Sequence, residues 1–184
     1  RLARQGIVRG EDLRRALEAP ETGGALWLTF DDFPQPGDDA LLDLLRRDGA
    51  PATFFCLGER LEGGAALVRR ALSEGHALQV HGWRHDPARP EVARCAAALR
   101  AWGARPTLHR PPGSSALWRI GGERLALPTL TPGDDLRPGE AELARRLSAW
   151  RPGVVAQLHA GVSQTRAVLP EAIGRARRRG GRLE

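Results

Sequence analysis

The sequence predicts an α/β fold built on a parallel sheet. Strand-like apolar runs alternate with amphipathic helical stretches almost without exception along the chain. The connections between them are short, so neighbouring strands are expected to run parallel. The 184 residues are enough for one hydrophobic core but too few for two, which predicts a single domain. An open doubly wound sheet and a closed or partly closed barrel both satisfy this alternation.

The first half of the chain shows the alternation most clearly. A short helix is expected over residues 10–19, where Leu13 and Leu17 share one face and Pro20 ends the segment. Apolar runs of strand length and leucine-rich helical stripes then follow in turn. These elements are a strand over 25–30, a helix over 38–48, a strand over 51–57, a helix over 65–73 and a strand over 76–80.

The second half continues the pattern with one less regular region. Pro90 suits the first turn of a helix and Gly103 lies beyond its end, so we expect a helix over 90–102. The region 114–133 is the least regular part of the chain. The remaining expected elements are strands over 106–109, 124–130 and 154–158 and helices over 139–150 and 166–179.

The composition is that of an ordinary globular protein, with 41% hydrophobic and 27% charged residues. No apolar run approaches the roughly 20 residues needed to cross a bilayer, and we expect any signal peptide to lie outside these residues. All 28 basic residues are Arg and the net charge is +6. We interpret the Arg cluster at 175–179 as a solvated helix face and expect no nucleic-acid partner. Cys56 and Cys95 are expected to be core residues. His109 is also close to a strand end, but it is still within its strand and could instead face the core.

Polar residues able to do chemistry follow most of the expected strands. Asp31 and Asp32 follow the first strand, and His81, Arg110 and His159 follow later ones. Parallel strands bring these ends to one edge of the sheet, so we expect the side chains to gather there. An isolated Asp pair more often begins a turn and caps a helix. The recurrence of polar residues at strand ends favours a functional site instead.

Two histidines four residues apart indicate a metal site. On a helical turn, His81 and His85 would project from one face and could bind one ion, although surface histidines often share this spacing. One nearby carboxylate would complete a three-ligand set that leaves positions open for water and substrate, as in catalytic sites. Asp31 and Asp32 are both candidates. Because adjacent residues of an extended chain point in opposite directions, one could bind the metal while the other acts as a base.

Two further side chains complete this hypothesis. Arg110, held by a rigid Pro-Pro turn, could orient a carboxylate beside the metal, or it could be one of many surface arginines. His159 could donate a proton to a leaving group, with Asp134 or Asp135 tuning its pKa. Alone, a histidine at this position is more often an ordinary residue at the end of a strand.

Taken in order, these residues resemble the five motifs of the polysaccharide deacetylases, the NodB-homology carbohydrate esterases. The matching segments are TFDD (29–32), HGWRH (81–85), RPPG (110–113), a degenerate fourth motif at 134–136 and QLH (157–159). The resemblance covers about residues 25–184. It implies a distorted (β/α) barrel with about seven parallel strands, preceded by an N-terminal helix and lead-in over residues 1–24.

The resemblance also implies roles that the spacing leaves open. It makes Asp31 the general base, Arg110 the residue that orients Asp31, and His159 the general acid. The implied metal ligands are Asp32, His81 and His85. The metal of this family is usually Zn²⁺, with Co²⁺, Ni²⁺ or Mn²⁺ as alternatives. The implied reaction is hydrolysis of an N-acetyl group on an amino sugar or an N-acetylated polysaccharide by a metal-activated water.

The sequence departs from the family pattern at several positions. Phe33 replaces a common Gly, Val80 replaces an Asn, and Ala160 and Gly161 replace an Asp after His159. The fourth motif, normally an Asp followed by an aromatic residue, is reduced here to an Asp pair followed by Leu. We choose Asp135 as the partner of His159. At the sugar groove we expect Phe33, Trp83, Pro112 and Leu158.

Two other functions remain open at this stage. The altered fourth motif would suit a catalytically weakened relative that binds metal or glycan. The Arg-rich surface could also dock on an anionic polymer, in which case binding should fall as salt rises. Export is common in the resembling family, but nothing in these residues indicates location, and the sequence does not reveal the oligomeric state.

Overall fold

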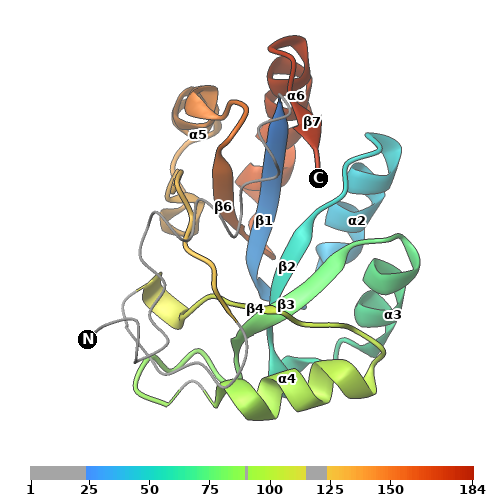
Figure 1. Ribbon diagram of the computed structural model, residues 1–184. Helices are drawn as coiled ribbons and strands as arrows, with labels where there is room; N and C mark the ends of the chain where they lie inside the picture. Colours follow the sequence, from blue (N-terminus) through green and yellow to red (C-terminus); the bar gives the residue numbers. More distant parts are fainter. Residues whose placement is uncertain (1–23, 90, 115–123) are drawn as a thin grey trace.

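A curled parallel sheet forms the centre of the molecule (Figure 1). The computed structural model describes residues 24–89, 91–114 and 124–184. The strands are β1 (Ala25–Phe33), β2 (Thr53–Leu57), β3 (Ala77–Gly82), β4 (Leu108–His109), β5 (Arg124–Leu125), β6 (Val155–His159) and β7 (Arg182–Leu183). They form one seven-stranded sheet in the order β5-β4-β3-β2-β1-β6, with β7 also paired to β1. The expected single α/β domain with about seven parallel strands is confirmed.

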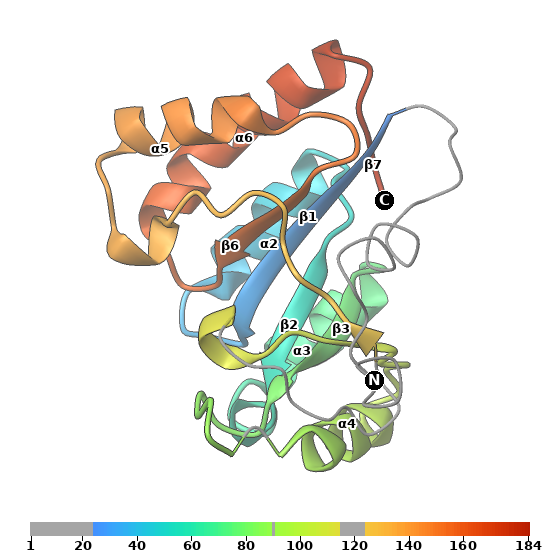
Figure 2. The same cartoon turned by 60° about the vertical axis from the view of Figure 1, so that its left-hand side comes forward.

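The sheet is a half-closed barrel and not an open doubly wound sheet. β5 and β6 are the two ends of the strand order, and Figure 2 shows the sheet curling between them. The chain that leaves β5 then crosses to the other end, where Leu130 forms an isolated parallel bridge with Ala156 of β6. The curl therefore turns the carboxyl ends of the strands towards a common space.

The helices pack against the outer side of the curled sheet (Figures 1 and 2). They are α2 (Asp38–Arg47), α3 (Ala65–Ser73), α4 (Val92–Ala101), α5 (Glu140–Arg146) and α6 (Ser163–Arg178). The leucine stripe expected at 38–48 is buried in α2, as amphipathic spacing requires. Among the helices of the described residues, none has the length and apolar character needed to cross a membrane.

Several element boundaries differ from those expected. The first strand was expected to end at Phe30, but it continues through the Asp pair to Phe33, with a register shift against β2 between Phe30 and Phe33. The expected strand over 124–130 is only Arg124–Leu125. The expected helix over 139–150 is α5 followed by a 3-10 turn at Leu147–Ala149. The helix expected over 10–19 lies outside the described residues.

An aromatic cluster anchors the strands that carry the site. The rings of Phe30 and Phe33 in β1 lie 5.4 and 4.4 Å from that of Phe54 in β2, measured between centroids. Cys56 and Cys95 are buried free thiols, which confirms that they are core residues. His109 is fully buried as well, so of its two alternatives it takes the core position. This dense packing leaves β1 little freedom to move relative to β2.

A buried carboxylate joins the loops that follow β1 and β6. Oδ2 of Asp38 accepts a hydrogen bond from the backbone N–H of Gln35 (2.7 Å), and its Oδ1 accepts one from Gly161 (2.8 Å). The Gln35 side chain donates to the carbonyl of Ala160 (3.1 Å). These contacts hold the segment after His159 against the segment after the Asp pair.

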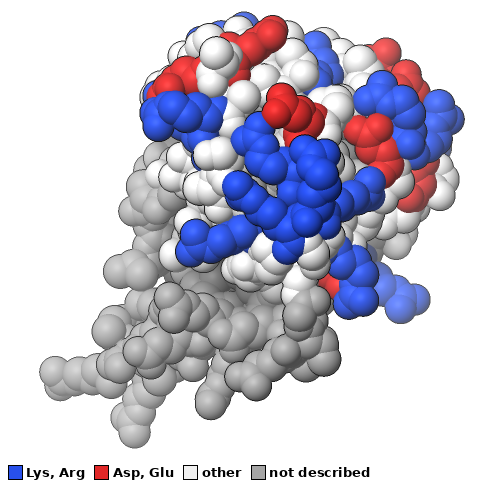
Figure 3. Space-filling view, turned by 90° about the horizontal axis from the view of Figure 1, so that it is seen from above, with Lys and Arg blue, Asp and Glu red and all other residues white. Residues whose placement is uncertain are grey.

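Arginine side chains gather over the C-terminal end of α6 (Figure 3). Arg175 pairs with Glu171 one turn earlier. Arg177 donates to the carbonyl of Gly49 (2.9 Å), and Arg179 donates to that of Ser148 (2.7 Å). Cations at this end of a helix interact favourably with the helix dipole. The two hydrogen bonds also hold α6 against neighbouring turns, so the cluster is more than a solvated face.

We predict that Gly58→Ala destabilises the fold. A Cβ atom at Gly58 would lie 2.4 Å from a ring carbon of Trp83, and the opposing indole is held by Arg94, 3.7 Å from the ring centroid. Overpacking of this kind costs about 1–3 kcal/mol. Thermal unfolding should show a lower Tm for Gly58→Ala. Gly63→Ala is the control, because the nearest atom to its Cβ would be 3.9 Å away; equal Tm values for the two variants would contradict the prediction.

Candidate active site

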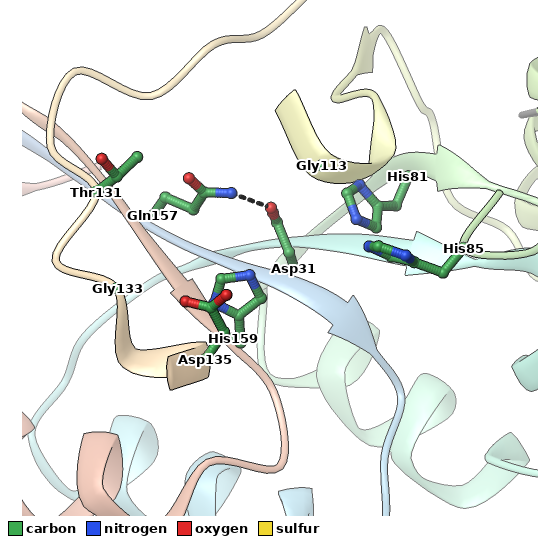
Figure 4. Close-up of a pocket in the computed structure, with 9 residues that line it drawn as sticks. All are labelled: Asp31, His81, His85, Gly113, Thr131, Gly133, Asp135, Gln157 and His159. Carbon is green, nitrogen blue, oxygen red and sulfur yellow. Dashed lines mark hydrogen bonds between the residues drawn. The ribbon is translucent and has the colours of Figure 1, made fainter. Parts of the chain in front are cut away.

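Three strands deliver polar side chains to one pocket (Figure 4). Asp31 belongs to β1, His81 to β3 and His159 to β6. Gln157 is also in β6, two residues before His159, so its side chain lies on the same face of the strand. Asp31 and His159 are direct register partners on the paired strands β1 and β6. The pocket has a volume of about 260 Å³. The expected gathering at the carboxyl ends of the strands is therefore observed.

Asp32, His81 and His85 form a compact group of metal-ligand type. Oδ1 of Asp32 lies 3.5 Å from Nε2 of His81 and 3.8 Å from Nε2 of His85. The ligand atoms of the three residues all lie within 4.8 Å of one another. Asp32 Oδ1 is buried, and within the described part of the chain it has no hydrogen-bond partner. A buried carboxylate oxygen facing two imidazole nitrogens fits a divalent cation.

The backbone around His81 favours its ligand form. His81 Nδ1 lies 2.8 Å from the carbonyl oxygen of Arg110, which can only accept, so Nδ1 carries the proton and Nε2 keeps its lone pair. Burial is the main cause that lowers the pKa of His81, and it outweighs the opposing charges of Asp31 and Asp32. A neutral imidazole with a free Nε2 is the form that binds metal.

The expected geometry of the Asp pair and the His pair was wrong in two details. His81 is in β3 and His85 is in the bend that follows, so the two histidines are not on a helical turn. Asp32 has a φ of 66°, in the left-handed region that non-glycine residues rarely adopt. Simple strand alternation therefore does not apply to Asp32. The strand irregularity at this point lets both acids approach His81.

Asp31 is held by donors on both carboxylate oxygens. Arg110 Nη1 donates to Oδ1 (2.7 Å), and the amide nitrogen of Gln157 donates to Oδ2 (2.6 Å). Burial tends to raise the pKa of Asp31, but the charge of Arg110, with the other donors, lowers it below its usual value. The side chain is 1% exposed and still ionised at neutral pH. Gln157 was not predicted as a site residue.

Arg110 is a buried structural partner and not a surface arginine. Its side chain is fully buried, with the guanidinium 4.1 Å from the ring centroid of Phe55. Nη1 also donates to Oγ1 of Thr29 (2.8 Å), and Nε donates to the carbonyl of Ala126 (3.2 Å). These contacts link β1 to the segments that follow β4 and β5, so they fix the guanidinium beside Asp31.

The partner of His159 is Asp134, which corrects our choice of Asp135. Nδ1 of His159 donates to Oδ1 of Asp134 (2.8 Å), and the backbone N–H of His159 donates to Oδ2 (2.8 Å). Thr165 also donates to Oδ2 (2.6 Å). Asp134 is fully buried, whereas Asp135 is exposed and lines the pocket. Both acids belong to one 3-10 turn, but the hydrogen bonds to His159 come from Asp134.

The carboxylate of Asp134 changes the acidity of His159. Burial tends to lower the pKa of His159, but the hydrogen bond and charge of Asp134 outweigh burial and raise the pKa to about 8. The imidazole is therefore largely protonated at neutral pH, with its Nε2 facing away from Asp134. A cationic imidazole beside a pocket is suited to give up a proton.

The residues expected at the sugar groove are mostly enclosed. Phe33 and Leu158 are fully buried in the core, and Pro112 is also buried. Trp83 is half-buried, with Arg94 covering one face of its ring. The prediction of Phe33 and Leu158 as sugar contacts is wrong, because a side chain with no exposed surface cannot touch a ligand in this conformation. The pocket is instead lined by polar side chains and glycines.

Comparison with known proteins identifies similar chains. The model of the polysaccharide deacetylase family matches residues 18–121, more than half of the chain. A peptidoglycan-N-acetylglucosamine deacetylase of Bacillus cereus is 33% identical over 105 residues, which cover 52% of this chain and 49% of that protein. A chitooligosaccharide deacetylase of a Bradyrhizobium species is 38% identical over 72 residues, covering 39% of this chain and 31% of that protein.

A solved structure extends the similarity over most of the fold. The peptidoglycan deacetylase PdaC from Bacillus subtilis superposes with a TM-score of 0.80 at 25% identity, covering 88% of this chain and 87% of that one. The segments matched in the curated relatives above span half or less of those proteins' lengths. The half-closed barrel of this chain is therefore the fold of the deacetylase structures.

We predict that Asp134→Asn lowers the pKa of His159. Folding raises the pKa of His159 from 6.5 to about 8. The stabilisation that the His159–Asp134 pair gives to the folded state is therefore fully present below pH 6.5. That contribution is lost as the pH rises through about 8. NMR titration of His159 should show a pKa shifted down in Asp134→Asn. Asp135→Asn is the matched control, and an equal shift in both variants would contradict the assignment.

Proposed function

Because the chain belongs to the polysaccharide deacetylase family, we propose that it is a metal-dependent hydrolase that removes N-acetyl groups from an amino-sugar polymer. The substrates named for the relatives, peptidoglycan N-acetylglucosamine and chitooligosaccharides, define the substrate class that we propose. The observation that carries this proposal is one pocket lined by an ionised Asp31, a protonated His159, and the His81 and His85 that group with Asp32.

We propose Asp32, His81 and His85 as the metal ligands. Support comes from their short mutual distances and from the buried Asp32 oxygen, which has no partner among the described residues. The set leaves coordination positions open, as in catalytic zinc sites. When bound there, a divalent cation such as Zn²⁺ would polarise the amide carbonyl and make a nearby water more acidic. The family resemblance favours Zn²⁺ among the divalent metals.

Asp31 is the proposed general base. It lines the same pocket as His81 and His85, so a water near the metal ligands would lie within its reach. Its ionised state, maintained by Arg110, leaves it able to take the proton of the attacking water. The amide carbon is a poor electrophile, so neutral water attacks it slowly. By removing a proton as the water attacks, the base makes the water a stronger nucleophile and raises the rate.

His159 is the proposed general acid. The departing amine must gain a proton, because otherwise the tetrahedral intermediate returns to amide. With a pKa of about 8, His159 holds a proton at neutral pH that it can donate. Asp134 keeps the imidazole oriented through Nδ1, so Nε2 is the nitrogen that delivers the proton. Asp31 and His159 therefore act from two strands that lie in register, β1 and β6.

The domain boundaries are also a proposal. We propose that residues 25–184 form the deacetylase domain and that residues 1–24 lead into it.

A catalytically weakened relative that binds metal or glycan was the second hypothesis, and the altered fourth motif was its motivation. The paired Asp134 and His159 argue against it, since they retain the hydrogen bond that an acid catalyst needs. Acetate release from chitooligosaccharides separates the two functions.

We predict that Asp32→Ala and His81→Ala lose both metal and turnover, while Asp31→Ala keeps the metal and loses turnover. Removal of a ligand weakens metal binding directly, whereas loss of the base leaves the three ligands in place. Elemental analysis and an acetate-release assay on chitooligosaccharides measure the two properties separately. The base variant should lose at least about a hundredfold in kcat.

Asp39→Ala, an exposed acid on α2, is the control and should match the unaltered protein in both assays. Full metal content in Asp32→Ala and His81→Ala would show that the ligand assignment is wrong. Metal-loaded protein that binds the oligosaccharide but releases no acetate would favour the glycan-binding alternative.

A further inference from the structure

Gln157 is a polar residue in an otherwise apolar stretch of β6. Its neighbours Val155, Ala156 and Leu158 are buried, while the Gln157 side chain reaches the pocket. Its amide nitrogen donates to Oδ2 of Asp31 over 2.6 Å, and Figure 4 shows this contact inside the pocket. The Gln157 side chain therefore contacts the Asp31 carboxylate directly.

The two donors hold Asp31 from different parts of the fold. Arg110, which follows β4, donates to Oδ1, and Gln157, from the neighbouring strand β6, donates to Oδ2. One donor alone would leave the carboxylate free to rotate about its last side-chain bond, since that torsion is soft. Two donors on different oxygens fix the plane of the group, and with it the direction of the lone pairs that can accept a proton.

From this geometry we infer that Gln157 is a positioning residue that aligns Asp31 for proton abstraction from the attacking water. The inference rests on the proposed function and deepens it. Alignment matters because misplacement of a reacting group by about 1 Å can reduce a rate a hundredfold. Gln157 is not itself a proton carrier, since a neutral amide neither accepts nor releases a proton at ordinary pH.

The chemistry of the amide suits this position. A cationic donor here would place a second positive charge beside Asp31, whose charge already pairs with Arg110. A carboxylate here would lie within hydrogen-bond distance of Asp31 and repel it. A neutral donor therefore orients the base without competing for its proton or pairing with its charge.

The test compares substitutions that keep the length of the side chain. Gln157→Met removes the donor and keeps the shape, and Gln157→Glu replaces the donor by a negative charge. Gln164→Met, on the first turn of α6, is the matched control. The readouts are kcat and KM for acetate release from chitooligosaccharides, metal content by elemental analysis, and Tm.

We expect Gln157→Met to lower kcat about tenfold, with KM within about twofold and metal content unchanged. Gln157→Glu should lower kcat further, and Gln164→Met should behave as the unaltered protein. A purely structural role would lower Tm and leave kcat per metal-loaded molecule unchanged. That outcome, or a loss of activity that parallels a loss of metal, would overturn the inference. An unaltered protein that releases no acetate would overturn the proposed function as well.

Discussion

The buried ion pair between Arg110 and Asp31 is the interaction on which the candidate site depends. The two side chains are 0% and 1% exposed, and Nη1 lies 2.7 Å from Oδ1. A buried charge without its partner would cost several kcal/mol, so each residue is tolerated only in the presence of the other. Arg110 also contacts Thr29 and Ala126. The same guanidinium therefore keeps the candidate base ionised and links β1 to the segment that follows β5.

Parallel register and one irregularity place the other groups around this pair. Pairing of β1 with β6 sets Asp31 opposite His159, and β3 brings His81 to the same rim. The left-handed conformation of Asp32 then directs a second carboxylate to the histidines, which a regular strand would not do. Backbone strain at a residue of this kind is common at functional sites because the surrounding structure must maintain it. The aromatic packing of β1 on β2 supplies that support.

The sequence predicted the fold class and the gathering of Asp31, Asp32, His81 and His159 because both follow from periodicity and strand ends. It could not separate Asp134 from Asp135, since that choice depends on which way a 3-10 turn faces β6. It also placed Phe33 in the sugar groove, although the strand continues past the Asp pair and buries that ring. Gln157 was detectable: a lone amide in an apolar strand, two residues before His159, projects to the same face.

The central claim is that these strands converge on one divalent cation held by Asp32, His81 and His85. Anomalous diffraction from crystals of the zinc-loaded protein, recorded at the zinc absorption edge, tests it most directly. We predict a single strong peak between Oδ1 of Asp32 and the Nε2 atoms of the two histidines. A peak instead at Asp134, Asp135 and His159, whose ligand atoms also lie within 4.8 Å of one another, would contradict the account.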